Sequence, residues 1–279
     1  MAAWKNWREC GNWGAPTFSA KTKNVIRFSR GRKEGLHLRV VTAGSGAKPE
    51  GAVAGSIFTG LGGMNTYAVG DIHGCFDGFR AILDRIASQV AGEPHRILVL
   101  GDYINIGPDS RKVLDYLIET PAITALCGDH DMMLLAAARG DARSIWNFEY
   151  HGGGETLRSF GVAKAADIPA RYTDYLRQRL VRYVEDGQRV FVHAAIDPTV
   201  GEMAFQDDTT LLCARKPVSP APDRAAPFVV HGHFPQADGL PEILPHRCNL
   251  DTDGCHTGVF TCGIFDDAQA DPIDILQVR

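Results

Sequence analysis

Five short apolar runs in this sequence are each followed by residues that can bind metal ions. The runs span residues 67–69, 96–100, 123–127, 190–192 and 228–230. The side chains that follow them are Asp71 and His73, Asp102, Asp129, His193 and His233. A single aspartate after an apolar run is usually a turn residue or a helix cap, and a single histidine is usually a core or surface group. Five runs that all end in Asp or His instead indicate one shared metal site.

The mixture of carboxylate and imidazole groups suits transition metals such as manganese, iron or zinc. Six ligands exceed the needs of one ion in an open catalytic site. We therefore expect two divalent or trivalent ions about 3.5–4 Å apart, bridged by a carboxylate. Such a pair clamps the oxygens of a phosphoryl group and activates water. The sequence predicts a metal-dependent phosphoesterase in which a metal-bound hydroxide attacks phosphorus directly.

The elements that position these ligands are predicted to alternate between strands and helices. The five apolar runs are typical of buried strands. The spacing of apolar residues between them predicts helices at 79–90 and 113–118, and residues 132–138 and 169–181 are further helix candidates. This alternation predicts an α/β protein with its ligands at the carboxyl ends of the strands. Asp71 and His73 are expected on one side of an extended segment, beside glycines that allow close approach to the ions.

An ordered set of motifs carries a family resemblance. The motifs are GDIHG at 70–74, GDYINIGPDS at 101–110, GDHD at 128–131, His193, and GH at 232–233. They resemble those of the calcineurin-like metallophosphoesterases, in the bacterial form of the serine/threonine protein phosphatase type. Segments 152–157, 212–215 and 249–252 also match. The resemblance runs from residue 64 to residue 262. It implies a layered β-sandwich flanked by helices (α/β/β/α) as one domain over residues 64–279.

The resemblance also implies roles for single residues. The ligands would divide between the ions as Asp71, His73 and His233 at one, Asp129 and His193 at the other, and Asp102 as the bridge. Manganese is the expected metal. His130, assisted by Asn105, would protonate or stabilise the leaving oxygen and contact the phosphate, which Arg215 would also bind. His231 would lie next to the ligands.

Four positions depart from the usual family pattern. Asn105 stands where aspartate is usual, Ile106 where arginine is usual, Asp129 where asparagine is usual and Asp131 where glutamate is usual. Asn105 can hydrogen-bond His130 but supplies no negative charge to keep it protonated. Ile106 removes a guanidinium group that would bind phosphate. The chain is therefore expected to be a phosphatase of altered activity or, alternatively, a degenerate member that binds phosphate with little turnover.

The substrate class stays open between two kinds of phosphate compound. The main expectation is a phosphomonoester, above all phosphoserine or phosphothreonine on a protein, or else a phosphorylated small molecule. The alternative is a symmetrical diadenosine tetraphosphate hydrolase, since those enzymes share these motifs and cleave a phosphoanhydride.

Composition and charge divide the chain at residue 63. Residues 1–63 contain ten basic and three acidic residues, whereas the whole chain has a net charge of −4. This basic stretch is expected to be a disordered extension without a catalytic role, either upstream of a natural start at Met64 or as a targeting peptide. The acidic remainder argues against nucleic acid as a partner. No apolar run of about 18 residues would span a membrane.

Cysteine and arginine patterns give weaker signals. The seven cysteines form no CxxC pair, which favours a reducing cytoplasm over a disulfide framework. A structural zinc site is a minor alternative for the set His246, Cys248, Cys255 and His256. An arginine-rich helical face is expected to be solvated, and a docking surface for acidic substrates is the minor alternative. Its members are Arg139, Arg143, Arg171, Arg177, Arg179 and Arg182.

Overall fold

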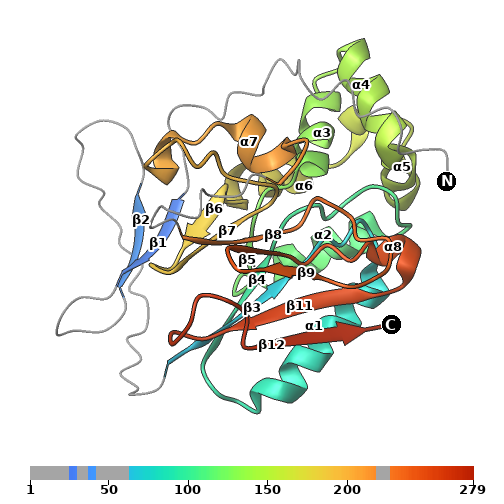
Figure 1. Ribbon diagram of the computed structural model, residues 1–279. Helices are drawn as coiled ribbons and strands as arrows, with labels where there is room; N and C mark the ends of the chain where they lie inside the picture. The colour runs from blue at the N-terminus through green and yellow to red at the C-terminus, as the bar shows by residue number, and fades with distance from the viewer. Residues whose placement is uncertain (1–24, 30–36, 42–62, 218–226) are drawn as a thin grey trace.

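The computed structural model describes residues 25–29, 37–41, 63–217 and 227–279, which form two β-sheets with helices around them (Figure 1). The first sheet has the strand order β2 (His37–Val41), β1 (Val25–Ser29), β6 (Tyr183–Glu185), β7 (Arg189–Val192), β8 (Phe228–His231), β10 (Arg247–Asn249) and β9 (Glu242–Leu244). The second has the order β12 (Asp274–Val278), β11 (Phe260–Phe265), β3 (Asn65–Val69), β4 (His95–Val99) and β5 (Thr124–Ala125).

Helices cover the outer faces and the end of this sandwich. α1 (Phe76–Val90) and α2 (Ser110–Glu119) pack on the second sheet through apolar residues at helical spacing, such as Phe79 and Ile82. The others are α3 (Asp129–Ala137), α4 (Ala142–Phe148), α5 (Gly154–Phe160), α6 (Ala170–Arg179), α7 (Asp208–Cys213) and α8 (Gly254–Thr257), with short turns at Glu149–Gly153, Ala165–Asp167 and Met203–Phe205. Within the described ranges, none of the helices combines the length and apolar composition needed to cross a bilayer.

Alternating side chains along the strands fill two cores. Ala68 and Leu98 point into the layer between the sheets, where they join Phe191, Val230 and Phe265. Their neighbours along the strands, such as Tyr67 and Val99, belong to the other core, which contains the residues of α1 and α2. Because strand side chains alternate between faces, a strand that is apolar throughout can serve both cores. The layered α/β/β/α architecture expected from the sequence is confirmed.

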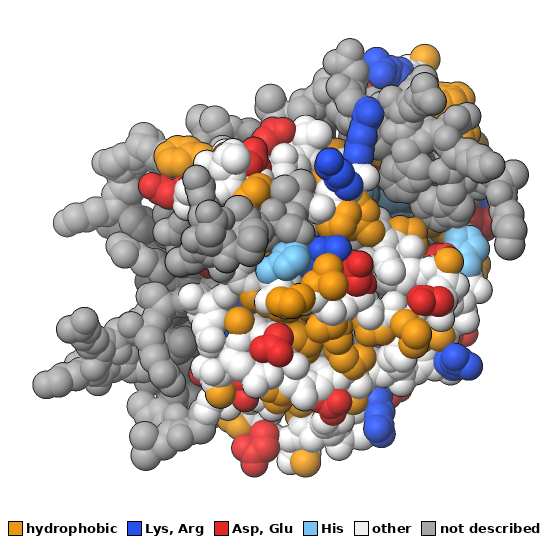
Figure 2. Space-filling model, in the orientation of Figure 1, with side chains coloured by type: hydrophobic (Ala, Val, Ile, Leu, Met, Phe, Trp, Pro, Cys, Tyr) orange, Lys and Arg blue, Asp and Glu red, His pale blue; other side chains and the backbone are white. Residues whose placement is uncertain are grey.

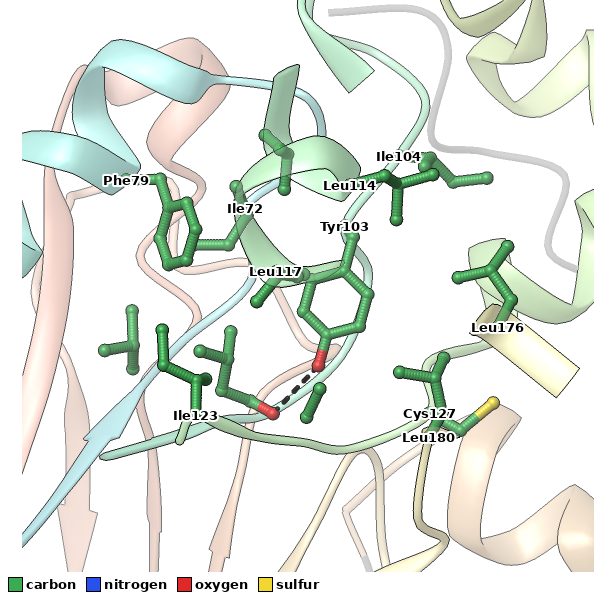
Figure 3. Close-up of a cluster of buried hydrophobic side chains, with 14 of the residues drawn as sticks. Ile72, Phe79, Tyr103, Ile104, Leu114, Leu117, Ile123, Cys127, Leu176 and Leu180 are labelled. Carbon is green, nitrogen blue, oxygen red and sulfur yellow. Dashed lines mark hydrogen bonds between the residues drawn. The ribbon is translucent and has the colours of Figure 1, made fainter. Parts of the chain in front are cut away.

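A buried tyrosine lies in the segment that follows β4. Tyr103 is fully buried beside Ile72, Leu117 and Ile123 (Figure 3). Its hydroxyl group lies 2.7 Å from the carbonyl oxygen of Leu126 and donates to it. The segment after β4 is thus fixed both by apolar packing and by a satisfied polar group.

The first 63 residues are not uniformly without structure. β1 and β2 form an antiparallel pair, and Ile26 and Arg27 of β1 pair in parallel with Val184 and Glu185 of β6. The expectation of a disordered extension is therefore wrong for these two segments, and the rest of that expectation lies outside the described residues.

A disulfide bond joins two segments near the carboxyl ends of the strands. Cys75, just before α1, is bonded to Cys255 in α8, 180 positions later. The cysteine pattern was expected to favour a reducing cytoplasm over a disulfide framework, and the Cys75–Cys255 bond removes that support. The other described cysteines, Cys127, Cys213, Cys248 and Cys262, form no disulfide bond.

Reduction of the Cys75–Cys255 bond is expected to lower the free energy of unfolding by about 2–4 kcal/mol, because a cross-link restricts the unfolded chain. Chemical denaturation followed by circular dichroism, with and without dithiothreitol, measures the difference. The control is Cys255→Ser, which cannot form the bond and should unfold identically in both conditions. Equal stability of the wild-type protein with and without reductant would contradict the prediction.

Candidate metal centre

The predicted ligands meet where two groups of parallel strands end. β3, β4 and β5 are parallel to one another, and β7 is parallel to β8. The segments that follow these strands carry all six predicted ligands. Five of them are buried, and His73 is the exception with partial exposure. The structure therefore brings together side chains that lie as much as 162 positions apart in the chain.

The ligand atoms form two groups that share Asp102. In the first, Nε2 of His73 lies 3.5 Å from Oδ2 of Asp102 and 3.9 Å from Oδ2 of Asp71. In the second, Nε2 of His193 lies 3.5 Å from Oδ2 of Asp102 and 3.3 Å from Oδ1 of Asp129. Among the described residues, two sets of side chains could each hold an ion: Asp102, Asp129, His193 and His233, and His73, Asp102 and His130. Asp102 belongs to both sets, as expected of a bridging carboxylate.

His233 belongs to the second group by its side chain. Its Nδ1 lies 3.3 Å from Oδ1 of Asp129 and 3.2 Å from Nε2 of His193. Its backbone reaches the first group, where its N–H donates to Asp71 at 3.1 Å. The geometry thus differs from the division expected from the resemblance, which placed the His233 side chain with Asp71 and His73.

Three of the predicted ligands have a left-handed backbone conformation. His73, Asp102 and His233 have φ angles of 49°, 54° and 66°. Asp71 and His73 therefore meet through a turn, and the expectation of an extended Asp-x-His segment is wrong. Gly232 allows the backbone to approach a ligand closely, because a methyl group added at Gly232 would lie against Oδ1 of Asp71, well inside van der Waals contact.

Asp131 ties two of the ligand loops together. Its Oδ2 accepts from the N–H of Asp102 at 3.1 Å and of Gly128 at 2.9 Å, and its Oδ1 accepts from the N–H of Tyr103 at 3.1 Å. The sequence pattern marked this position only as an unusual Asp in place of Glu. Its structural role depends on the approach of the 101–103 loop, which no local signal reveals.

The electrostatics of the cluster favour bound cations. Asp71, Asp102 and Asp129 are all at least 94% buried, and burying like charges together is costly unless positive charge balances them. Burial raises the pKa of Asp71. Burial is the largest single influence on Asp102 and acts in the same direction, but the charges of His193 and His130 and the hydrogen bond to His193 together outweigh it, and the pKa of Asp102 falls to about 2. Carboxylate and imidazole donors around Asp102 fit divalent transition metals.

His130 and Asn105 form a hydrogen-bonded unit beside the ligands. Nδ2 of Asn105 lies 3.0 Å from Nδ1 of His130, while Oδ1 of Asn105 accepts from Thr156 Oγ1 at 2.8 Å. In this arrangement the amide group donates to His130, whose Nδ1 accepts. Burial lowers the pKa of His130 to about 4. The partnership of Asn105 with His130 was expected, whereas Thr156 was not recognised as the residue that orients Asn105.

Ile106 adopts a backbone conformation that is unfavourable for its side chain. Its φ is 65°, directly after Asn105 at 70°. A β-branched residue in this region is a true outlier and costs about 1–3 kcal/mol. Its N–H donates to the carbonyl of Gly152 at 3.3 Å. Backbone strain of this kind clusters at functional sites, where the surrounding structure holds it in place.

The remaining predicted site residues flank the cluster. Arg215 is exposed, and the preceding residue, Ala214, has its carbonyl oxygen 3.2 Å from Nε2 of His233. His231 turns to a different partner, since its Nε2 accepts from Arg247 at 2.9 Å. Burial lowers the pKa of His231 to about 3.

Two weaker expectations fail. The zinc alternative is wrong because Cys255 is bonded to Cys75 and Cys248 is fully buried in the core between the sheets. Among the described residues, the groups able to hold an ion do not include that set. Arg182 is no part of a solvated face, since it is buried and paired with Asp208.

A family model described as calcineurin-like phosphoesterase matches residues 64–254. The chain belongs to the calcineurin-like phosphoesterase family. The match covers both groups of ligand atoms around Asp102. The protein is therefore a metallophosphoesterase, and its cluster of Asp and His side chains lies within the matched range.

Curated relatives of this metallophosphoesterase share one name. A Nitrosomonas europaea protein named bis(5'-nucleosyl)-tetraphosphatase, symmetrical, is 39% identical over 136 residues, which are 48% of this chain and 46% of that protein. A Pseudomonas putida protein of the same name is 35% identical over 162 residues, or 53% and 52% of the two chains. The chain thus spans about half the length of the curated relatives it matches.

Solved structures agree with the fold. A protein proposed to be a diadenosine tetraphosphatase superposes with a TM-score of 0.58 at 19% identity, covering 92% of this chain and 98% of the other. A serine/threonine phosphatase from Saccharomyces cerevisiae superposes with a TM-score of 0.52 at 15% identity, covering 77% and 80%. At these identities the likeness concerns the fold alone.

Gly232→Ala is expected to lower both bound metal and phosphoesterase activity by at least tenfold, because the methyl group displaces Asp71. Metal analysis of the purified protein and hydrolysis of nitrophenyl phosphate measure the two effects. The matched control is Gly201→Ala, where an added methyl group meets open space. Normal metal content in Gly232→Ala would show that the close approach is not needed.

Proposed function

We propose that this metallophosphoesterase hydrolyses symmetrical dinucleoside tetraphosphates to two nucleoside diphosphates with the help of two metal ions. The main support is the shared name of its curated relatives, the symmetrical bis(5'-nucleosyl)-tetraphosphatases. The two ligand groups around Asp102 suit the reaction. The expectation of a phosphoprotein substrate has no such support, and the alternative reading of the motifs becomes the proposal.

In this proposal, each of the two ligand groups binds one metal ion. Asp71, His73 and Asp102 would hold one ion, and the second would bind to Asp102 and to the set Asp129, His193 and His233. When bound, two such ions polarise a phosphoryl group and activate water. The close contacts among the second set of nitrogen and oxygen atoms, 3.2 to 3.5 Å, leave them positioned to converge on one cation.

The proposed leaving group does not need a protonated His130. Water adds to a central phosphorus atom, the bond to the central bridging oxygen breaks, and that oxygen becomes the terminal oxygen of a nucleoside diphosphate. A terminal phosphate has a second pKa of about 6, so it departs near neutral pH without a proton. A serine alkoxide would need one. His130 with a pKa of about 4, bonded to an amide rather than a carboxylate, is therefore adequate for a phosphoanhydride.

His130 and Arg215 are proposed to contact the substrate phosphates. The His130 ring lies 4.6 Å from that of His73, so its Nε2–H can donate to a phosphoryl oxygen at the first metal site. Arg215 follows the Ala214 carbonyl that contacts His233, and its exposed guanidinium group suits an outer phosphate of a long chain.

Diadenosine tetraphosphate is expected to yield ADP as the sole nucleotide product, at a rate at least a hundredfold above that on a phosphoserine peptide. Chromatography of nucleotides and a phosphate assay measure the two reactions. Prior treatment with a chelator should abolish both, and manganese should restore them. Formation of AMP with ATP, or faster hydrolysis of the peptide, would refute the proposal.

Asn105→Asp is expected to raise activity on a phosphoserine peptide about tenfold or more, which is part of the roughly 10²- to 10⁴-fold that a general acid contributes. A carboxylate accepts the Nδ1–H of His130 and favours its protonated form. Nitrophenyl phosphate is the control substrate, because nitrophenolate leaves without a proton. An equal change on both substrates would show that Asn105 does not control proton donation.

A further inference from the structure

Two aromatic side chains are stacked on the surface of the helical end of the molecule. Trp146 lies on α4, and Tyr150 lies four residues later on the π-helical turn Glu149–Gly153. Their ring centroids are 4.9 Å apart, with an interplanar angle of 18°. Each side chain is 51% exposed. Such a pair offers a flat apolar face that a planar ligand can cover.

A line of rings connects this pair to the metal centre. The centroid of Tyr150 lies 5.1 Å from that of His151, which lies 6.0 Å from that of His130. The His130 ring in turn contacts His73 of the first ligand group. His151 is fixed in this line, because its Nδ1–H donates to the carbonyl of Asn147 at 2.8 Å. The exposed pair is therefore continuous with the phosphate-handling groups.

Ile106 adds an aliphatic group near the inner end of this line. A Cβ atom added at Gly152 would lie 2.8 Å from the nitrogen and 3.1 Å from Cγ1 of Ile106. The backbone kinks at Gly152, where φ is 87°, and this kink lets the turn that carries Tyr150 and His151 pack against Ile106. An aliphatic side chain in a left-handed conformation, next to aromatic rings, suits contact with an uncharged part of the substrate.

Positive charge accompanies the aromatic pair. Arg143 is exposed three residues before Trp146, and Arg139 is exposed at the end of α3. Figure 2 shows Lys and Arg side chains (blue) at the end of the molecule where Figure 1 places α3 and α4. A ligand with both a planar base and anionic phosphates matches this combination of apolar and basic groups.

We propose that Trp146 and Tyr150, with Ile106 and His151 at the inner end, form the subsite for one nucleobase of the dinucleoside polyphosphate. This inference rests on the proposed function, and it assigns the substrate's base to α4 and the turn after it. The base stacks on the exposed face of the aromatic pair while its phosphate chain extends past His151 toward His130. Stacking of this kind tolerates different bases, so adenine and guanine dinucleotides should both bind.

The test compares a substrate that has bases with one that lacks them. Trp146→Ala and Tyr150→Ala should each raise KM for diadenosine tetraphosphate about tenfold, with kcat within about twofold. Hydrolysis of inorganic tetraphosphate should keep its wild-type KM. Trp146→Phe should have a nearly normal KM for diadenosine tetraphosphate, because phenylalanine keeps an aromatic face at this position. The control Phe205→Ala, at a side chain that is 74% exposed outside the ring line, should change neither substrate.

A binding measurement makes the test independent of catalysis. The other tryptophans are Trp4, Trp7 and Trp13, so quenching of fluorescence by ADP that disappears in Trp146→Phe reports on Trp146. An unchanged KM in both alanine variants, together with quenching independent of Trp146, would overturn the subsite while ADP formation by the wild type keeps the proposed function. An equal rise of KM for inorganic tetraphosphate would also overturn it. Absence of ADP formation by the wild type would instead refute the proposed function.

Discussion

The structure depends on the placement of three carboxylates where water is nearly excluded. Asp71, Asp102 and Asp129 converge at the ends of β3, β4 and β5. Two like charges about 4 Å apart repel by roughly 4 kcal/mol at the effective dielectric constant of a protein surface. Backbone N–H groups offset part of this cost, since the N–H of His233 donates to Asp71 and that of His130 donates to Asp102 at 3.0 Å. Cations on the shared ligands would balance the rest.

The burial of these three carboxylates constrains the surrounding backbone. Asp131 holds the loops after β4 and β5 at a fixed separation through three N–H groups. Gly128 and Gly232 leave room for the oxygens of Asp102 and Asp71. Left-handed turns at several ligands are tolerated because the buried network determines their positions, as is usual for strained residues at functional sites. These buried hydrogen bonds position the ligand loops in advance of substrate binding, and such preorganisation favours catalysis.

The chemistry and the substrate surface agree with each other. A metallophosphoesterase that cleaves an anhydride needs little proton donation to its leaving group, and Asn105 beside His130 is compatible with that need. The same loop presents Ile106 instead of a cationic side chain and packs it against the turn that carries Tyr150 and His151. In the proposed function, Asn105 relates to the leaving group and Ile106 to the recognition of an uncharged part of the substrate.

The sequence by itself determined the ligand types, their places after apolar strands and the layered α/β architecture. These features are local, since periodicity along the chain and glycine beside aspartate or histidine can be read without knowing the fold. Tertiary structure alone decided which of these side chains lie together, as the side chain of His233 joins His193 and Asp129. It also decided the bond between Cys75 and Cys255, the pairing of β1 with β6, and the ring line through His151. Each of these contacts joins segments distant in the chain or depends on a kink such as that at Gly152, and no pattern of neighbouring residues specifies such contacts.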